Sequence, residues 1–252
     1  MTDIKLLPNE RLDQINENLS LIQDKNGLTF GTDAYLLASF VKNRAGVGAD
    51  FGSGTGVASL LCLSKNKFSF VYAFEVQDKF ARLTERNAVL NGFCEKSKVY
   101  CKDVRDITPD DTNGWIDTVI SNPPYLKADE GFANKTDEMN IARREMNGTI
   151  YDFCASASKI LKHGGIFYTV YRPDRLAEMI HALKCNTLEP KRIVTVHPDT
   201  NTPASLVLIE SKKGAAPSLK FAKPLFIYKD GTRTYTEDMD RVYEETSLDF
   251  LF

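Results

Sequence analysis

The residues with the clearest capacity for chemistry form the tetrapeptide Asn122-Pro123-Pro124-Tyr125. Two consecutive prolines end the strand-like run before them and fix the backbone that follows. The Asn122 side-chain oxygen and the Pro123 carbonyl then offer two acceptors, which is what a planar NH₂ group can satisfy. Tyr125 can stack on the ring that carries such a group. The tetrapeptide therefore predicts a site that positions a planar amino nitrogen, with Asn122, Pro123 and Tyr125 as its catalytic residues.

A glycine-rich segment lies upstream of the tetrapeptide. Gly52, Gly54 and Gly56 alternate directly after the strand-like run 47–51. A strand-to-helix turn without side chains lets the backbone approach a ligand closely. Several classes of nucleotide-binding enzyme use such a loop, so the loop alone does not identify the ligand. The tetrapeptide could also be an ordinary turn, because Asn and Pro are common turn residues. A glycine loop upstream disfavours this alternative.

Three acidic residues accompany the glycine loop. Asp50 stands two positions before the first glycine, while Glu75 and Asp103 end or follow the next two predicted strands. Asp50 suits a cationic amino group, Glu75 suits ribose hydroxyls, and Asp103 suits the amino group of adenine. Each could alone be a helix cap or a loop carboxylate. Together with the loop they predict S-adenosylmethionine as cofactor, and a nicotinamide dinucleotide stays open because Glu75 identifies only a ribose.

A parallel sheet must position these residues, because β-rich runs alternate with helical stretches from residue 46 onward. The expected strands are 47–51, 70–74, 98–102, 117–121, 165–171, 191–197 and 204–210. The expected helices are 56–64, 78–91, part of 136–162, and 174–184. The last two strands, joined by a turn at 198–203, are expected to form an antiparallel hairpin at one edge. The pattern predicts an α/β fold with a mostly parallel, seven-stranded sheet and helices on both faces.

Two segments flank the predicted core, which spans residues 46–210. Residues 1–45 hold apolar runs at 19–23 and 28–30 and a helical stretch at 32–41, and are expected to cap the cofactor pocket. Thr32 and Asp33 could cap that helix or approach the cofactor's methionine end, and both interpretations stay open. Residues 211–252 are expected to be an irregular extension packed on or near the core, with a strand-like piece at 224–228.

Composition excludes several classes of protein. The five cysteines are odd in number and form no Cys-x-x-Cys pair, so neither a disulfide framework nor a metal site is expected. No signal sequence or apolar run of about 20 residues occurs, which predicts a cytoplasmic protein without a membrane span. The net charge of −2 does not indicate nucleic acid, yet basic residues gather in 159–192 and 205–233, where they could meet a polyanion. The oligomeric state stays open, with a monomer favoured.

The glycine loop and its acidic partners resemble those of the Rossmann-like class I methyltransferases over roughly residues 28 to 210. In that family the acids matched by Asp50 and Glu75 hold the methionine portion and the ribose of the cofactor, and Asn122 borders it. Asn-Pro-Pro-Tyr is shared by enzymes that methylate adenine N6 and by those that methylate glutamine side chains. DNA enzymes usually carry a recognition domain and glutamine enzymes a helical N-terminal domain. This chain has no spare segment of that size and reaches its glycine loop by residue 52.

At finer grain the sequence resembles the bacterial family that methylates N6 of adenine-37 in the anticodon loop of a valine tRNA. The matching stretches are 30–34, 141–145, 171–176 and 188–192, with shorter matches at 197–198 and 213–214. The resemblance implies a tRNA substrate. The family's Arg-His-Glu run appears here as Arg143-Arg144-Glu145, which leaves the role of the central position open.

A tRNA substrate would give a role to basic residues near the site. The candidates for phosphate contacts are Arg143, Arg144, Arg172, Arg175, Lys191 and Arg192, with ordinary surface ion pairs as the alternative. His197, between a strand and a proline, is expected to be structural. Two other functions stay open: a protein glutamine-N5 methyltransferase, and a non-catalytic RNA-binding protein that retains this fold. The intact Asp50, Glu75 and Asn122 disfavour the second of these.

Overall fold

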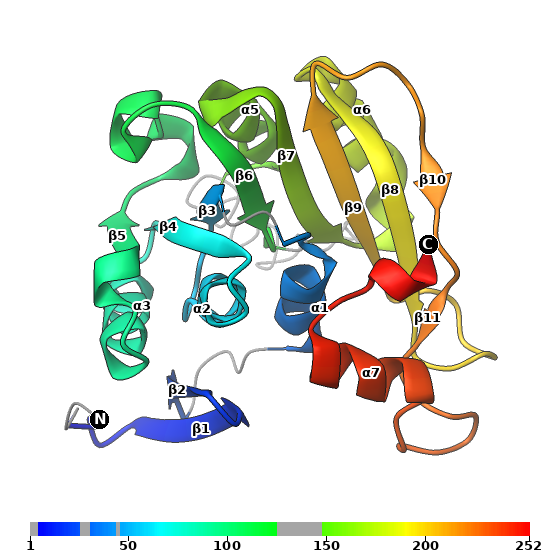
Figure 1. The fold of residues 1–252 in the computed structure, drawn as a ribbon, viewed down its shortest axis with the longest axis horizontal. Coiled ribbons are helices and arrows are strands. Elements are labelled where there is room, and N and C mark those ends of the chain that lie inside the picture. Colours follow the sequence, from blue (N-terminus) through cyan, green and yellow to red (C-terminus); the bar gives the residue numbers. More distant parts are fainter. Residues whose placement is uncertain (1–4, 26–30, 44–45, 125–147) are drawn as a thin grey trace, which may run out of the picture.

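The structure, a computed structural model, describes residues 5–25, 31–43, 46–124 and 148–252. Its centre is a sheet in which seven main strands follow the order β8-β9-β7-β6-β3-β4-β5 (Figure 1). These strands are β3 Gly46–Phe51, β4 Phe68–Glu75, β5 Ser97–Cys101, β6 Ile116–Ser121, β7 Leu161–Tyr171, β8 Leu188–His197 and β9 Leu206–Lys213. Each contains a strand expected from the sequence or overlaps it by most of its length.

The strand directions confirm a mostly parallel sheet. β5, β4, β3, β6 and β7 pair in parallel, whereas β9 runs antiparallel to both β7 and β8. The expected hairpin is therefore present, with its second strand inserted between β7 and β8. Two short strands, β10 Lys220–Phe221 and β11 Leu225–Phe226, pair with the outer side of β8 and bring the described sheet to nine strands. The expectation of seven missed them because two residues are too few to show a period.

Helices cover both faces of this sheet (Figure 1). One face carries α1 Thr32–Phe40, α2 Val57–Ser64 and α3 Asp78–Leu90, and the other carries α5 Ile150–Ile160 and α6 Leu176–Cys185. Successive residues of one strand point to opposite faces, so Ile120 belongs to the core under α1 and Val119 to the core under α5. The short 3₁₀ turns are η1 Cys94–Lys96, η2 Val104–Asp106, η3 Pro109–Thr112, η4 Pro173–Arg175 and η5 Asp249–Leu251.

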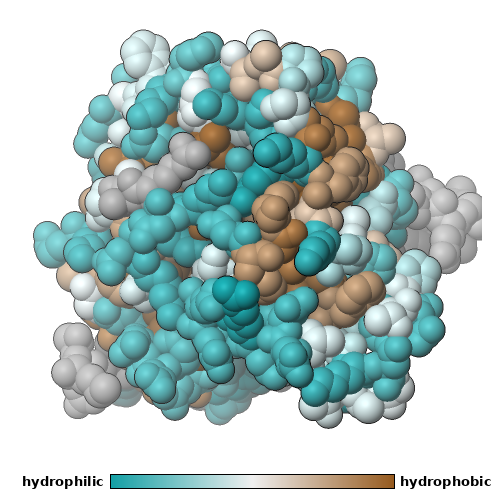
Figure 2. Space-filling model, turned by 45° about the vertical axis from the view of Figure 1, so that its right-hand side comes forward, coloured by the Kyte–Doolittle hydropathy of each residue, from teal (hydrophilic) through white to brown (hydrophobic). Residues whose placement is uncertain are grey.

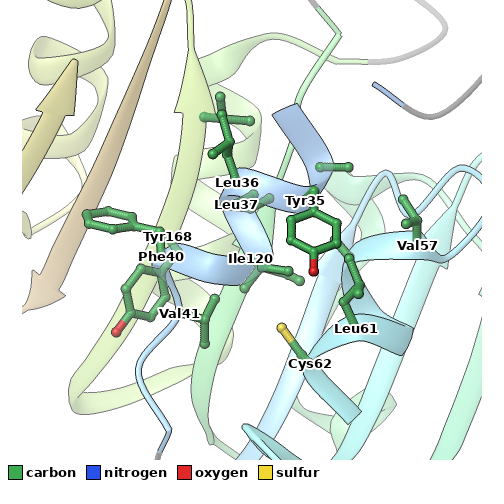
Figure 3. Close-up of a cluster of buried hydrophobic side chains, with 14 of the residues drawn as sticks. Tyr35, Leu36, Leu37, Phe40, Val41, Val57, Leu61, Cys62, Ile120 and Tyr168 are labelled. Atoms are coloured by element: carbon green, nitrogen blue, oxygen red, sulfur yellow. The ribbon is translucent and has the colours of Figure 1, made fainter. Parts of the chain in front are cut away.

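Helix α1 is deeply enclosed. All residues from Ala34 to Phe40 are buried, and Figure 3 shows Tyr35, Leu37 and Phe40 packed among side chains of α2, β6 and β7. A helix that is apolar on nearly every side needs neighbours on every side. The position of α1 is therefore set by packing with the sheet and with residues distant in sequence.

Two buried cations satisfy the carboxyl-terminal end of α1, where backbone carbonyls lack partners within the helix. Lys67 Nζ donates hydrogen bonds to the carbonyls of Ala38, Ser39 and Val41 at 2.7, 3.2 and 2.6 Å. Arg192 Nη2 lies 3.4 Å from the carbonyl oxygen of Phe40. Burial lowers the pKa of Lys67 to about 8. Positive charge at this end also complements the helix dipole.

The N-terminal segment forms a separate antiparallel hairpin of β1 Glu10–Asn16 and β2 Leu19–Asp24, which lies beside α3 (Figure 1). The apolar run at 19–23 forms most of β2, whereas the run at 28–30 lies outside the described residues. Asn87 and Asn91 of α3 bind this hairpin, because their side-chain oxygens accept the backbone N–H groups of Ile22 and Ser20 at 2.7 and 3.0 Å.

The C-terminal segment is more ordered than expected. It contains α7 Glu237–Glu245, whose Met239 and Val242 are buried in the same core as α1. The expectation of an irregular tail was wrong, because this helix needs only a few apolar residues at helical spacing to bury one face. Figure 2 shows apolar surface grouped on the face turned forward, and the exposed large apolar side chains of this segment are Leu219, Phe221 and Phe252.

Candidate active site

Four polar residues line one edge of the sheet. Asp50 lies near the end of β3, Glu75 ends β4, and Asn122 and Asp103 follow the ends of β6 and β5. Because β6, β3, β4 and β5 are parallel neighbours, their carboxyl ends meet at the same edge. The residues lie there in the order Asn122, Asp50, Glu75, Asp103, which is the arrangement expected for a ligand at the end of a parallel sheet.

The glycine loop between β3 and α2 depends on backbone shapes that side chains disfavour. Gly52 and Gly56 have φ values of +71° and +80°, in the left-handed region. The Gly52 N–H donates to the Phe74 carbonyl at 2.8 Å, which ties the loop to β4. A Cβ atom at Gly56 would lie 2.8 Å from Thr84 Cγ2, so the loop and α3 approach each other as closely as a glycine permits.

Two buried residues of α3 hold the loop from the other side. Thr84 Oγ1 donates to the Gly54 carbonyl at 2.8 Å, and Asn87 Nδ2 donates to the Thr55 carbonyl at 2.9 Å. Asn87 also bonds to Ile22, so one side chain joins the N-terminal hairpin to the loop. Sequence reasoning missed both residues because it considered only the apolar positions of this helix. Polar residues on the buried face of a helix usually have hydrogen-bond partners, and this pattern could have indicated both residues.

Asp50 lies beneath the loop with a relative exposure of 2%. Ser59 Oγ of α2 donates to its carboxylate at 2.5 Å. Burial raises the pKa of Asp50 to about 7, although the Ser59 hydrogen bond opposes that rise and the nearby Glu75 charge adds to it. A cationic group placed against Asp50 would favour its ionised form. The residue is therefore suited to the amino group for which the sequence proposed it.

The carboxylate of Glu75 is fixed by two backbone donors. Its Oε2 accepts the Gly54 N–H and its Oε1 accepts the Gln77 N–H, both at 3.0 Å. Each carboxylate oxygen can accept a second hydrogen bond, which leaves capacity for hydroxyl groups of a ligand. Glu75 thus couples the glycine loop to the end of β4 and aims its carboxylate along the sheet edge.

Asp103 has a partner that the sequence did not indicate. Arg105 binds its carboxylate through Nε and Nη2 at 2.9 and 2.6 Å, and the Arg105 N–H adds a bond of 2.8 Å. The Arg105 guanidinium holds the pKa of Asp103 below its usual range. An adenine amino group at this position would share the carboxylate with Arg105.

Asn122 is oriented by α1. Its Nδ2 donates a hydrogen bond to Asp33 Oδ2 at 2.9 Å. The amide oxygen of Asn122 therefore points away from Asp33. Asp33 Oδ1 also accepts the N–H of Ala34 at 3.0 Å. The residue at the helix N-cap is Gly31, and no side chain caps it, so the interpretation of Thr32 as the cap is wrong. Thr32 contacts Tyr243 of α7 instead.

A cavity of about 200 Å³ adjoins the two prolines of the tetrapeptide, on the face of the sheet covered by α5 and α6. Its walls come from the segment after β6, the start of α5, the end of β7 and the start of α6. The lining residues are Pro123, Pro124, Gly148, Thr149, Ile150, Tyr151, Phe153, Tyr171, Arg175 and Glu178.

The basic residues proposed for substrate contact differ in their surroundings. Arg172 is half-buried just beyond β7 and binds Asp174 through Nε and Nη2 at 2.9 and 2.7 Å. Arg175 lines the cavity and pairs with Glu178. Lys191 Nζ donates to the Ala216 carbonyl at 2.8 Å. Tyr125, Arg143 and Arg144 lie outside the described residues.

Arg192 does not fit the role expected of it. It is 7% exposed, and its guanidinium binds Glu210 and Asp249, each at 2.8 Å, and lies over the rings of Phe40 and Phe252. Strand β8 also stands three strands from β6, which is about 14 Å at the usual strand spacing. A phosphate contact by Arg192 is therefore excluded by burial, and the residue is part of the frame around α1.

His197 has local partners, as expected of a structural residue. Its Nδ1 lies 3.0 Å from the Thr202 carbonyl and its Nε2 lies 3.2 Å from Thr195 Oγ1. Among the described residues, no three His, Cys, Asp or Glu side chains are grouped as metal ligands. In the same part of the chain, no helix is both long and apolar enough to cross a bilayer.

The site combines a glycine loop with acidic residues at the strand ends, and the parallel sheet has one reversed strand near its edge. Together these features define a Rossmann-like methyltransferase. The family model described as "Methyltransferase small domain" matches residues 24–184, and the chain belongs to this family. A solved structure of a predicted O-methyltransferase from Agrobacterium tumefaciens superimposes with a TM-score of 0.69 at 26% identity, covering 85% of this chain and 97% of that one.

Curated relatives carry a more specific name, tRNA1(Val) (adenine(37)-N6)-methyltransferase. One from Bacteroides fragilis (strain YCH46) is 27% identical over 188 residues, covering 74% of this chain and 78% of the relative. Another from Flavobacteriaceae bacterium (strain 3519-10) is 22% identical over 230 residues, covering 90% of this chain and 93% of the relative. The likeness therefore extends beyond the segment that the family model matches.

Proposed function

We propose that this methyltransferase transfers the methyl group of S-adenosylmethionine to N6 of an adenine in a tRNA anticodon loop, namely adenine-37 of tRNA(Val). The observation that carries the proposal is the hydrogen bond of 2.9 Å from Asn122 to Asp33. It orients an amide acceptor at the sheet edge, beside the Pro123 carbonyl. The names of the curated relatives support adenine in tRNA as the group that these acceptors hold.

The residues present fit S-adenosylmethionine. Asp50, Glu75 and Asp103 lie at the carboxyl ends of adjacent strands. They suit, in that order, the amino group, the ribose hydroxyls and the adenine amino group. A Cβ atom at Gly54 would have no heavy atom of the described residues within 4 Å, so the loop backbone faces open space there. A ligand can reach that backbone closely. The remaining proposed contacts are Gly52, Gly56, Thr32, Asp33 and Asn122.

Catalysis by this chain rests on holding the acceptor nitrogen. The cofactor supplies an electrophilic methyl group on a positively charged sulfur. Asn122 Oδ1 and the Pro123 carbonyl accept the two hydrogens of the adenine amino group and thereby direct its nitrogen along the sheet edge. The acceptor nitrogen gains the methyl group together with its positive charge and then loses one proton to solvent, so placement of the two acceptors matters more than a strong base. Stacking by Tyr125 on the adenine ring belongs to the same proposal.

Substrate contacts of Arg143, Arg144, Arg172, Arg175 and Lys191 also remain proposals. An anticodon loop suits this site because its bases are single-stranded and can leave the stack at lower cost than bases of a duplex. We further propose that residues 1–45 cap the cofactor, residues 46–210 form the catalytic core, and residues 211–252 are an extension on it. Asn87 supports the cap, because it binds both β2 and the glycine loop. A cytoplasmic location follows from the proposed substrate.

The test is methyl transfer from labelled cofactor to unmodified tRNA(Val) and, in parallel, to a release-factor-like protein. Label on adenosine N6, identified after nuclease digestion, is the expected result. Label on protein with none on RNA would favour a glutamine-N5 methyltransferase instead. Asn122→Ala is the matched variant: it should still bind the cofactor, through the other proposed contacts, and transfer no methyl group. A variant with full turnover would refute the assigned role.

A further inference from the structure

The tetrapeptide faces two different compartments. On one face of the sheet, the side chain of Asn122 is bound by Asp33 of α1. On the other face, Pro123 and Pro124 form a wall of the cavity beside α5 and α6, and Asn122 is not part of its lining. A base whose amino group is held by Asn122 therefore does not fill this cavity, which can take another group of the substrate.

The walls of the cavity have the chemistry of a nucleobase site. Tyr151 and Phe153 come from α5 and Tyr171 from the end of β7, which places three aromatic rings among the ten lining residues. Arg175 lies over the Tyr171 ring, with its guanidinium carbon 5.8 Å from the ring centre. Aromatic rings and guanidinium planes are the surfaces on which proteins stack unpaired bases.

Polar groups at the same walls can contact the edge of a base. Arg175 carries N–H donors and Glu178 carries acceptors, and the two form an ion pair beside the cavity. The Tyr151 hydroxyl lies 3.0 Å from His181 Nδ1, which fixes the direction of its ring. A volume of about 200 Å³ suits one planar base and excludes a longer stretch of RNA.

We propose that this cavity binds the nucleobase adjacent to the target adenine, so that Tyr151, Arg175 and Glu178 determine the sequence context in which the enzyme acts. The proposal rests on the proposed function, because it requires an RNA strand whose neighbouring base reaches the prolines. Stacking in the cavity holds the strand on one side of Asn122. The target base is then presented to the cofactor on the other side.

The test couples a residue of the cavity to a base of the RNA. Anticodon stem-loops are prepared intact, without the base on the 5′ side of the target adenine, and without the base on its 3′ side. Binding of each RNA is measured for the unmodified enzyme, Tyr151→Ala and Arg175→Ala. Tyr151→Phe keeps the ring and loses the hydroxyl. Arg241→Ala removes an exposed arginine of α7 that pairs with Glu245 and lies over the Phe250 ring, and that does not line the cavity.

We expect Tyr151→Ala to bind intact RNA about tenfold more weakly, which is the low end of the effect of losing a stacked base. For the unmodified enzyme, removal of one of the two neighbouring bases should cost the same factor. The same removal should cost Tyr151→Ala almost nothing, because the two changes delete one interaction. Tyr151→Phe and Arg241→Ala should keep the full response to base removal. Cofactor affinity, measured separately, should be equal in all variants and shows that they are folded.

The inference would be overturned if the losses of RNA affinity caused by Tyr151→Ala and by each base removal simply multiply. No neighbouring base would then occupy the cavity. Coupling of Tyr151 only to removal of the target base, measured with a fourth stem-loop that lacks that base, would also overturn the inference, because it would assign the cavity to the target. Methyl transfer to tRNA persists in either case, so the proposed function would stand. Absence of any transfer to RNA by the unmodified enzyme would refute both.

Discussion

Asn122 Nδ2 and Asp33 Oδ2 lie 2.9 Å apart, which joins the residue after β6 to the first turn of α1. An asparagine side chain presents an acceptor at one end and a donor at the other. Asp33 accepts only, so it selects the rotamer in which the amide oxygen is directed away from it. The orientation of the catalytic acceptor is therefore determined by a helix 89 positions earlier in the chain.

Replacement of Asp33 by alanine should lower kcat roughly a hundredfold, because loss of orientation at a reacting group costs about that much. Asp33→Asn keeps an acceptor for the Asn122 amide and should lose far less. Both variants are compared by single-turnover methylation of the stem-loop RNA. Equal activity of the alanine variant and the unmodified enzyme would contradict the orienting role.

Cofactor affinity should rise with pH between about 5.5 and 7, by about tenfold, because Asp50 has a pKa raised to about 7. The protonated carboxyl cannot pair with the cofactor's ammonium group, and the ionised fraction grows as pH approaches the folded pKa. Without ligand, the free energy of unfolding depends on pH in the opposite direction. The folded state keeps a proton that the unfolded chain releases above 3.8, so the free energy of unfolding falls as pH rises toward 7.

Calorimetric titration at several pH values measures this effect, with Asp50→Asn as the matched variant. The amide cannot ionise and can still accept a hydrogen bond from Ser59. Its affinity should be low and nearly independent of pH in this range. A variant that keeps the pH dependence of the unmodified enzyme would assign the titration to another group.

Lys67→Met should lower the free energy of unfolding by about 3 kcal/mol, because it leaves buried carbonyls at the end of α1 without donors. Urea denaturation measures the change. Lys65→Met is the control, since Lys65 lies two positions away with an exposed contact to the Glu244 carbonyl, and should change stability by no more than about 0.5 kcal/mol. Similar losses in both variants would show that the helix end does not depend on Lys67.

Arg192→Met should cost roughly 3–5 kcal/mol of stability, because it leaves Glu210 as a buried carboxylate without its cation. RNA affinity, measured under conditions where the variant is folded, should depend on salt as in the unmodified enzyme. A reduced salt dependence would restore Arg192 as a phosphate contact.

Arg172→Ala should have the opposite effects to Arg192→Met: little change in stability and a changed salt dependence of RNA binding. Its exposed ion pair with Asp174 contributes little to stability, so the midpoint of unfolding should hardly change. Loss of one phosphate contact should reduce the slope of log affinity against log salt concentration by about 1. Binding measured at several salt concentrations tests this, and an unchanged slope would remove Arg172 from the substrate-binding residues.

The sequence predicted the sheet well because local signals and the chemistry of the site coincide there. Runs of β-rich residues end in Asp50, Glu75 and Asn122, and parallel pairing alone then brings these residues to one edge. The reversed β9 was also predictable, since residues 198–203 can only return the chain. Both results rest on short-range patterns.

Other parts of the site depend on contacts between distant residues, which no local pattern reveals. Asn87 belongs to an amphipathic helix by its spacing, yet its bonds to Ile22 and Thr55 require the assembled fold. The same holds for Arg192, whose charge suggested surface exposure until packing against Phe40 enclosed it. Asp103 also binds Arg105, two positions away, a contact that its place after a predicted strand did not indicate.

The enclosure of α1 by late parts of the chain also affects how the enzyme is made. Tyr35 of this helix bonds to the Tyr243 carbonyl and to Thr246, contacts that span 208 and 211 positions. Contacts of such separation form late in folding because closing a long loop costs entropy. During synthesis, a chain that has not reached residue 246 cannot lock α1, and Asp33 cannot yet direct Asn122. The complete enclosure of α1 thus has to wait until the ribosome has added residue 246.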